Sequence, residues 1–205
     1  MKKVFLPILM AVVLSSALPE SCRAQLFSIG LKGGACVSSV VGADAGSPQT
    51  NLGLAGGAYA TVGILPWFTL QPEVLYVQKG WKESAEVLGT TVEGDFRINY
   101  LEVPVLAKFS LGAVVKPYLA IGPYLATRLG TSAKFSAGGV SVEGNLDELV
   151  KKSDAGMIIG AGVQTPVKLS FEARYSYGLG TIDDSGQNLD IKNSALSLLI
   201  GYALF

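Results

Sequence analysis

The chain has 205 residues, with 16 basic side chains, 16 acidic side chains and no histidine. A net charge of zero gives no electrostatic footprint for nucleic acid, and the absence of histidine removes the usual general base of Ser-His-Asp hydrolysis and the commonest metal ligand. Charged residues make up only 16% of the chain, against about 25% in soluble domains, yet no run of about 18 apolar residues that could form a spanning helix follows the N-terminal segment.

Residues 1–24 are predicted to be a secretory signal peptide. Two lysines precede an apolar core at residues 4–14, and small residues follow it. This core is too short for a membrane-spanning helix. Two alternatives are a retained anchor helix and a lipoprotein acylated at Cys22, although the residues before Cys22 fit a lipoprotein poorly. The remaining residues, 25–205, are expected to form one domain without an internal disulfide, because Cys36 is then its only thiol.

A period of two in hydrophobicity predicts β-strands from the start of this domain. The first three strands are expected at residues 27–36, 52–64 and 68–80. A segment rich in Gly, Ser, Asp and Pro at 37–51 predicts a loop between the first two. A tight turn at 65–67 joins the second strand to the third.

After a polar loop at 81–95, residues 98–128 contain two strands joined by a short hinge at 112–115. In the first strand, Glu102 and Lys108 lie in one row, and the alternating positions from Leu101 to Phe109 form an unbroken apolar row: Leu101, Val103, Val105, Ala107, Phe109. Each strand has roughly the 9–11 residues that a tilted strand needs to cross a bilayer. The pattern therefore predicts a transmembrane hairpin.

The longest connection is expected at 129–153. Within it, Asn145 is expected to cap a short helix through Lys152, because acidic residues lie in its first turn and lysines in its last. The rest of the chain is expected to form three strands and their connections, at 154–164, 167–178 and 193–205, with a turn at 164–167 and a loop at 179–192.

Together these patterns predict an all-β fold, an eight-stranded antiparallel up-and-down transmembrane β-barrel. Short and long connections alternate along the chain, which is the pattern of bacterial outer-membrane barrels with short periplasmic turns and long extracellular loops. We therefore expect an outer-membrane location with membrane lipid as a partner, and no cofactor, metal or catalytic site. An extracellular ligand or envelope protein would bind through the four long loops, 37–51, 81–95, 129–153 and 179–192.

The polar row of each strand is predicted to face the lumen. An eight-stranded barrel is only wide enough to be filled by side chains, and buried charges persist when they are paired. We therefore expect a lumen closed by salt bridges, with an excess of bases that contact water, Tyr59, Tyr118 or Tyr124. The predicted lumen charges are Lys32, Glu73, Lys79, Glu102, Lys108, Arg128, Lys168, Glu172 and Arg174.

Three prolines lie inside the predicted strands, at positions 72, 104 and 123. Proline removes a donor from the hydrogen-bond ladder and is usually confined to edges and bulges. Because a closed barrel has no edge, we expect local bulges at Pro72, Pro104 and Pro123.

The chain resembles the PorT-like outer-membrane β-barrel proteins of Gram-negative bacteria, which often carry only a porin-family description. The matching segments occur in order along nearly the whole domain: Gln71-Pro-Glu-Val-Leu-Tyr, Tyr100-Leu-Glu-Val-Pro-Val-Leu, Pro117-Tyr…Gly122-Pro-Tyr, Asp154-Ala-Gly…Gly160-Ala-Gly, Arg174-Tyr-Ser-Tyr-Gly-Leu and Gly201-Tyr…Phe205. The resemblance implies an eight-stranded outer-membrane barrel. It implies no activity and no functional residues, although the namesake takes part in a secretion system.

The leading hypothesis is a non-enzymatic barrel with a structural role or a binding role through its loops. A component of a secretion or envelope-biogenesis machinery and a narrow small-solute channel are the alternatives. An enzyme is disfavoured by the missing histidine, and the adjacent acids Asp183 and Asp184 are typical of a solvated turn, with weak calcium binding as the competing interpretation. A soluble lipocalin-type carrier would need the opposite placement of polar and apolar rows.

Overall fold

The computed structural model describes residues 27–46, 48–87, 90–137, 140–187 and 189–204. The predicted signal peptide, residues 1–24, lies outside these ranges. Within them the chain forms nine β-strands: β1 (Phe27–Val41), β2 (Gln49–Leu65), β3 (Phe68–Val87), β4 (Thr90–Ser110), β5 (Lys116–Ala137), β6 (Val140–Gly144), β7 (Ser153–Gln164), β8 (Leu169–Gly178) and β9 (Lys192–Ala203). The same ranges contain no helix long and apolar enough to cross a membrane.

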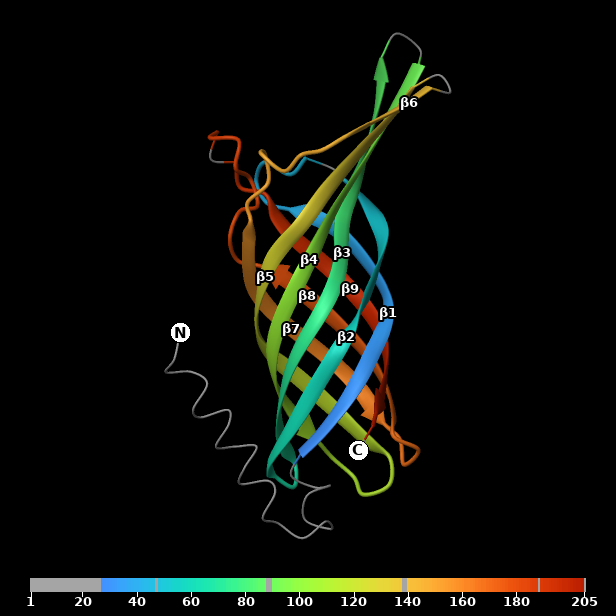
Figure 1. Cartoon of the computed structure of the whole chain (residues 1–205), viewed down its shortest axis with the longest axis vertical. Coiled ribbons are helices and arrows are strands. Elements are labelled where there is room, and N and C mark those ends of the chain that lie inside the picture. Colours follow the sequence, from blue (N-terminus) through green and yellow to red (C-terminus); the bar gives the residue numbers. More distant parts are fainter. Residues whose placement is uncertain (1–26, 47, 88–89, 138–139, 188, 205) are drawn as a thin grey trace.

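Eight of these strands close into a barrel (Figure 1). Each strand pairs antiparallel with the next one along the chain, and β9 pairs with β1 to complete the ring. The ninth strand, β6, pairs only with β5 among the described strands and lies outside the ring. The predicted eight-stranded up-and-down barrel is therefore confirmed.

Side chains alternate between the lumen and the outer surface along every barrel strand. In β9 the burial alternates without interruption from Ala195 to Ala203, with Leu196, Leu198 and Ile200 half exposed on the outside. On β5, Leu119 and Leu125 are 63% and 68% exposed, whereas Tyr118 and Tyr124, the residues just before them, are buried. A continuous band of exposed large apolar side chains is unstable in water and matches the hydrocarbon of a bilayer.

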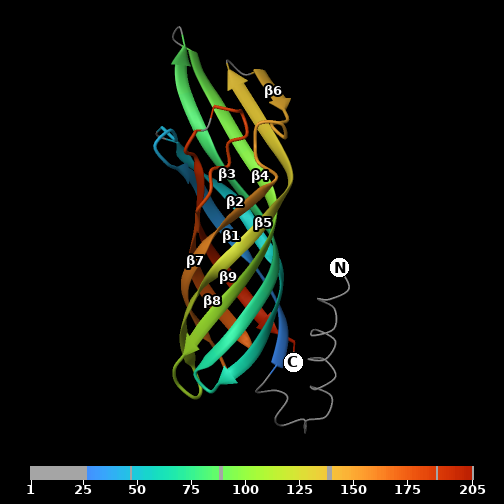
Figure 2. The same ribbon diagram turned by 90° about the vertical axis from the view of Figure 1, so that its left-hand side faces the viewer.

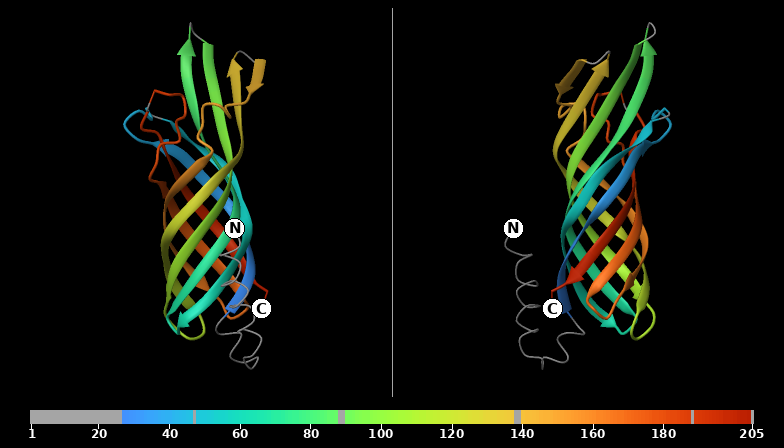
Figure 3. Two further views of the ribbon diagram at one scale, coloured as in Figure 1. Left: turned by 60° about the vertical axis from the view of Figure 1, so that its left-hand side comes forward. Right: turned by 90° about the vertical axis from the view of Figure 1, so that its right-hand side faces the viewer.

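The two ends of the barrel differ in how far the chain extends beyond the ring of strands (Figures 2 and 3). At one end, called here the short-turn end, the strands are joined by turns at residues 66–67, 111–115 and 165–168. At the other, the long-loop end, β3, β4, β5 and β6 rise above the remaining strands. We call this raised sheet, residues 81–87, 90–97, 131–137 and 140–144, the rim.

The long connections are shorter than the sequence predicted, because the strands continue into them. The first loop, expected at 37–51, is limited to residues 42–48. The segment 81–95 is not a loop: the β3–β4 ladder continues in register from Trp81↔Phe96 to Val87↔Thr90. Most of the polar segment that indicated a loop is therefore a β-hairpin that forms part of the rim.

The helix expected from Asn145 to Lys152 is also absent. The Asn145 side chain does accept a hydrogen bond from the backbone N–H of Asp147, at 2.6 Å. The backbone then forms turns rather than a helix and reaches an isolated bridge at Val150. β5 and β6 occupy the preceding residues, so the expected connection at 129–153 shortens to 145–152 after β6.

The strand prolines do not produce the bulges that we expected. The β2–β3 pairing keeps one register on both sides of Pro72, and the β4–β5 pairing does so around Pro104 and Pro123. The register shifts lie elsewhere, between Thr50 and Ala55, between Gly63 and Leu65, and between Asn99 and Tyr100. Each proline removes a donor from the ladder, but the pairs on either side hold the register.

Three inward-facing glycines lie directly opposite inward-facing tyrosines on the neighbouring strand. The pairs are Gly30↔Tyr59, Gly162↔Tyr118 and Gly156↔Tyr124. A Cβ atom at Gly162 would lie only 2.5 Å from the hydroxyl of Tyr118, and one at Gly156 only 2.5 Å from the ring of Tyr124. The missing side chains therefore make room for the tyrosine rings inside the barrel.

Replacing Gly162 by valine should destabilise the barrel by roughly 1–3 kcal/mol, because the side chain would displace Tyr118 in a packed interior. Gly130→Val is the matched control, since no atom lies within 4 Å of a Cβ at Gly130. Urea unfolding of both variants in lipid vesicles measures the difference. Equal effects of the two substitutions would contradict the packing argument.

Candidate functional site

A cluster of charged side chains lies in the half of the lumen nearer the short-turn end. Lys32 on β1 lies between two carboxylates, with its Nζ 2.6 Å from Oε1 of Glu73 on β3 and 3.2 Å from Oε2 of Glu172 on β8. Tyr118 donates a hydrogen bond to the same Glu172 oxygen at 2.9 Å. All three charged residues are buried, so their desolvation is compensated by these contacts.

Arg174 on β8 links the two sides of the barrel. Its Nη1 donates a hydrogen bond to Oε2 of Glu73 at 2.7 Å. β3 and β8 are separated by four positions in the eight-stranded ring and so lie opposite each other. Arg174 also approaches Glu172 at 3.7 Å and Glu102 at 4.0 Å. The Arg174–Glu73 pair therefore crosses the lumen.

A second cluster lies closer to the long-loop end. The Nζ of Lys79 is 2.8 Å from Oε2 of Glu102 and 4.0 Å from Oδ2 of Asp154. Asp154 accepts hydrogen bonds from Tyr124 at 3.1 Å and from Asn193 at 2.9 Å. The Asn193 amide also donates to the hydroxyl of Tyr100 at 3.1 Å. β9 and β4 are opposite strands too, so this contact spans the lumen a second time.

Lys108 is the lumen lysine nearest the short-turn end. Its Nζ donates to Oε1 of Gln71 at 2.9 Å and lies 3.7 Å from the centre of the Tyr118 ring. Gln71 in turn donates to Glu73 at 2.6 Å. Within the described residues, no carboxylate forms an ion pair with Lys108.

Seven of the nine charges expected in the lumen are buried there: Lys32, Glu73, Lys79, Glu102, Lys108, Glu172 and Arg174. Lys168 was wrongly placed. It lies exposed in the turn before β8, with φ of 64°, and its Nζ donates to the carbonyl oxygen of Leu204. The turn extends two residues further than its Thr-Pro sequence indicated, so β8 begins at Leu169 instead of Val167.

Arg128 lies at the upper edge of the lumen. Its guanidinium donates to the carbonyl oxygen of Val150 and approaches Asp147 at 3.6 Å. The sequence interpretation missed Asp154, although it occupies the inner row of β7. The alternation of β7 could have identified it.

The described part of the deep lumen is balanced in charge. Four bases, Lys32, Lys79, Lys108 and Arg174, face four acids, Glu73, Glu102, Asp154 and Glu172. The excess of bases that we expected is absent because Lys168 lies outside, Arg128 lies at the edge and Asp154 adds an acid.

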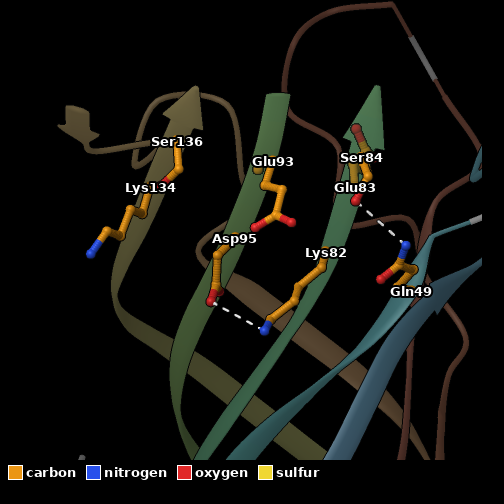
Figure 4. A pocket seen from close by; sticks show the side chains of 9 residues that line it. Gln49, Lys82, Glu83, Ser84, Glu93, Asp95, Lys134 and Ser136 are labelled. Carbon is orange, nitrogen blue, oxygen red and sulfur yellow. Dashed lines mark hydrogen bonds and ion pairs between the residues drawn. The ribbon is translucent and has the colours of Figure 1, made fainter. Parts of the chain in front are cut away.

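A polar surface of a different kind covers the rim (Figure 4). A pocket of about 350 Å³ is lined by residues from four strands, among them Gln49, Lys82, Glu93, Asp95 and Lys134. Lys82 approaches Asp95 at 3.9 Å. The rim also contains three aromatic rings in contact: Trp81 stacks on Phe96 at 4.9 Å between centroids, and Phe96 meets Phe135 edge-on at 5.5 Å.

The carboxylate of Asp183, one of the acidic pair in the last long loop, forms hydrogen bonds within that loop. Asp183 accepts hydrogen bonds from the backbone N–H groups of Ser185 and Leu189, at 3.1 and 3.3 Å. Hydrogen bonding from Ser185 lowers the pKa of Asp183. Its carboxylate therefore stabilises its own loop, and the described residues contain no group of three or more ligands suited to a metal ion.

The family model described as the outer membrane protein beta-barrel domain matches residues 23–184. No curated protein matches the chain. Solved structures with a similar fold include Ail of Yersinia pestis in complex with a heparin analogue, at 20% identity and TM-score 0.46, covering 87% of this chain and 99% of that one. Neisserial surface protein A has 17% identity and TM-score 0.49, covering 86% and 97%. OprG from Pseudomonas aeruginosa has 12% identity and TM-score 0.45, covering 88% and 97%.

Proposed function

Because the chain belongs to the outer membrane protein β-barrel domain family, we propose that it is a non-enzymatic outer-membrane barrel that presents its rim to a partner outside the cell. The short turns of such barrels face the periplasm and the long loops face the exterior. The rim is therefore the part of the protein that extends furthest from the membrane on the outer side (Figure 1).

The single observation that carries this proposal is the Arg174–Glu73 contact across the lumen, at 2.7 Å. The Asn193–Tyr100 contact spans the lumen at a second level. Side chains that join opposite walls leave little space for a diffusing solute, which disfavours the narrow-channel alternative. Function is then expected on an outer surface, where loops and strand ends are held by the rigid barrel.

The chemistry of the rim favours a polar protein partner of mixed charge. Lys82, Arg97 and Lys134 alternate with Glu93 and Asp95 on adjacent strands. Trp81, Phe96 and Phe135 occupy the alternate positions of the same strands and therefore project from the opposite face of the rim. The rim thus has a charged face and an apolar face, and both kinds of surface occur in protein interfaces. A uniformly anionic ligand such as a sulfated sugar would meet the carboxylates of the rim and is disfavoured.

The segments that resemble PorT-like proteins supply lumen contacts. Glu73, Tyr100, Glu102, Tyr124 and Arg174 all belong to those segments and to the two clusters described above. They support the proposal that this chain and PorT-like proteins have a similar barrel interior. A role in a secretion machinery would need a binding surface for a partner outside these segments.

Ser84 on the rim and Ala113 in the short-turn end provide a direct test of this orientation. Both residues are exposed, and the native Cys36 is fully buried. We expect Ser84→Cys to react with a membrane-impermeant maleimide on intact cells, and Ala113→Cys to react only after the outer membrane is permeabilised. A gel shift with a polymer-linked maleimide measures both.

The Ser84→Cys protein should also cross-link to a second protein when a photoreactive maleimide is used on intact cells. Protection of Ser84→Cys, or labelling of Ala113→Cys on intact cells, would contradict the proposal that the rim is presented outside.

A further inference from the structure

A cavity of about 700 Å³ occupies the short-turn end of the barrel. It is lined by the first residues of β1, the turn after β4 and the start of β8, and Lys108 is the most buried charged residue in its lining. Lys116 and Lys168 also line the cavity, and the described residues that line it include no acid. The volume is in the range of small-molecule sites, about 300–1,000 Å³.

Lys108 has no carboxylate partner, unlike every other buried lysine of the described lumen. Lys32 and Lys79 each have a carboxylate within 2.8 Å, whereas Lys108 has only the amide oxygen of Gln71 and the face of Tyr118. Its residue exposure is 7%. An ammonium group withdrawn from water without a counterion is costly, and an anion in the adjoining cavity would reduce that cost.

The charges of the lumen are also separated along its axis. Near the long-loop end, Lys79 faces two carboxylates, Glu102 and Asp154. Nearer the short-turn end, the three bases Lys32, Lys108 and Arg174 outnumber the two acids Glu73 and Glu172. Lys116 and Lys168 add positive charge at the mouth. The field at this opening therefore attracts anions, and the low-dielectric wall around it strengthens the attraction.

We propose that the cavity is a binding site for a small anion with phosphate or carboxylate oxygens, which enters from the short-turn side. The ammonium of Lys108 is the innermost donor, and those of Lys116 and Lys168 contact the ligand at the mouth. The hydroxyl groups of Thr69 and Ser170 line the wall between them. This site is separate from the rim and does not depend on the proposed function of the rim.

Calorimetric titration of the whole folded protein in an uncharged maltoside detergent tests the site. Inorganic pyrophosphate and citrate are the probes for phosphate and carboxylate chemistry. We expect at least one of them to bind, and Lys108→Met to weaken that binding tenfold or more. Lys134→Met, which removes a lysine from the rim, should leave it unchanged.

The Lys108→Met protein is first checked for retained folding by its gel mobility before and after boiling. If it fails to fold, Lys116→Met combined with Lys168→Met replaces it, with a loss of at least threefold expected. Absence of binding of both probes to the unaltered protein would overturn the proposal, as would equal binding by the folded Lys108→Met protein. A preference for pyrophosphate or for citrate identifies the anion class.

Discussion

Glu73→Gln should destabilise the barrel by about 3–5 kcal/mol, because it leaves buried positive charge without its partner. Glu73 is 1% exposed and contacts Lys32 at 2.6 Å and Arg174 at 2.7 Å through separate oxygens. Glutamine has nearly the same shape, so the packing is conserved and the loss is electrostatic. Lys32 keeps Glu172 as a neighbour, at 3.2 Å, and Arg174 keeps only contacts of 3.7 Å or longer.

The free energy of unfolding, measured in urea with lipid vesicles, gives the magnitude. Glu143→Gln is the matched control. Glu143 pairs with Lys134 at 3.8 Å, but its side chain is 77% exposed. A solvent-screened pair of this kind contributes roughly 0–1 kcal/mol. If both glutamine variants lose the same stability, the lumen network does not hold the opposite walls together.

A double substitution separates the contribution of the Glu73–Arg174 ion pair from that of side-chain shape. Glu73→Gln combined with Arg174→Met removes the charge from both walls and should recover part of the loss, giving a coupling of about 0.5–3 kcal/mol between the two sites. Additive losses would mean that Arg174 and Glu73 act independently. The contact between Arg174 and Glu73 would then not contribute to the free energy of unfolding.

Most of the barrel could be predicted from the sequence because its signal is local. Each residue of a spanning strand faces either lipid or lumen, so a period of two is visible without knowledge of the partner strand. The inward positions of Lys32, Glu102 and Arg174 followed from that alternation alone. Asp154 follows the same rule, but it was left out of the predicted lumen charges because it lies at the very start of a strand, where the alternation begins.

The ends of the strands could not be predicted in the same way. Above the membrane both faces of a hairpin meet water, so the alternation that marks a strand disappears from segments such as 82–95. The pairing there depends on the adjacent strand, as Lys82 opposite Asp95 illustrates. Lys168 was misplaced for a related reason, since a turn can extend by two residues, here to Lys168, without any change in composition.

The contacts between charged side chains inside the lumen could not be predicted from the sequence either. Glu73 and Arg174 are 101 residues apart, and their contact depends on closure of the ring and on the tilt of its strands. Alternation places each residue on the inner face without giving its height along the barrel axis. The separation of charge along that axis emerged only from the three-dimensional positions.

Leu198→Arg should destabilise the protein by about 2–4 kcal/mol in a bilayer, the cost of an arginine at the middle of the lipid face of a barrel. Leu198 is 60% exposed on β9, between Ala35 of β1 and Ala173 of β8. These neighbours are small, so the new side chain has space and steric strain is minor. The expected loss therefore comes from contact of the guanidinium with hydrocarbon.

Leu111→Arg is the control for this substitution, because Leu111 is 72% exposed in the turn after β4. An arginine near the interface should cost about 0–1 kcal/mol. Unfolding of both variants is compared in phosphatidylcholine vesicles whose hydrocarbon thickness is varied by chain length. The Leu198→Arg penalty should grow with thickness, because the arginine then reaches water less easily, and the Leu111→Arg penalty should not. Equal, thickness-independent losses would mean that the outer leucines of β9 do not face lipid, and the assignment of the exposed apolar band to the membrane would fail with them.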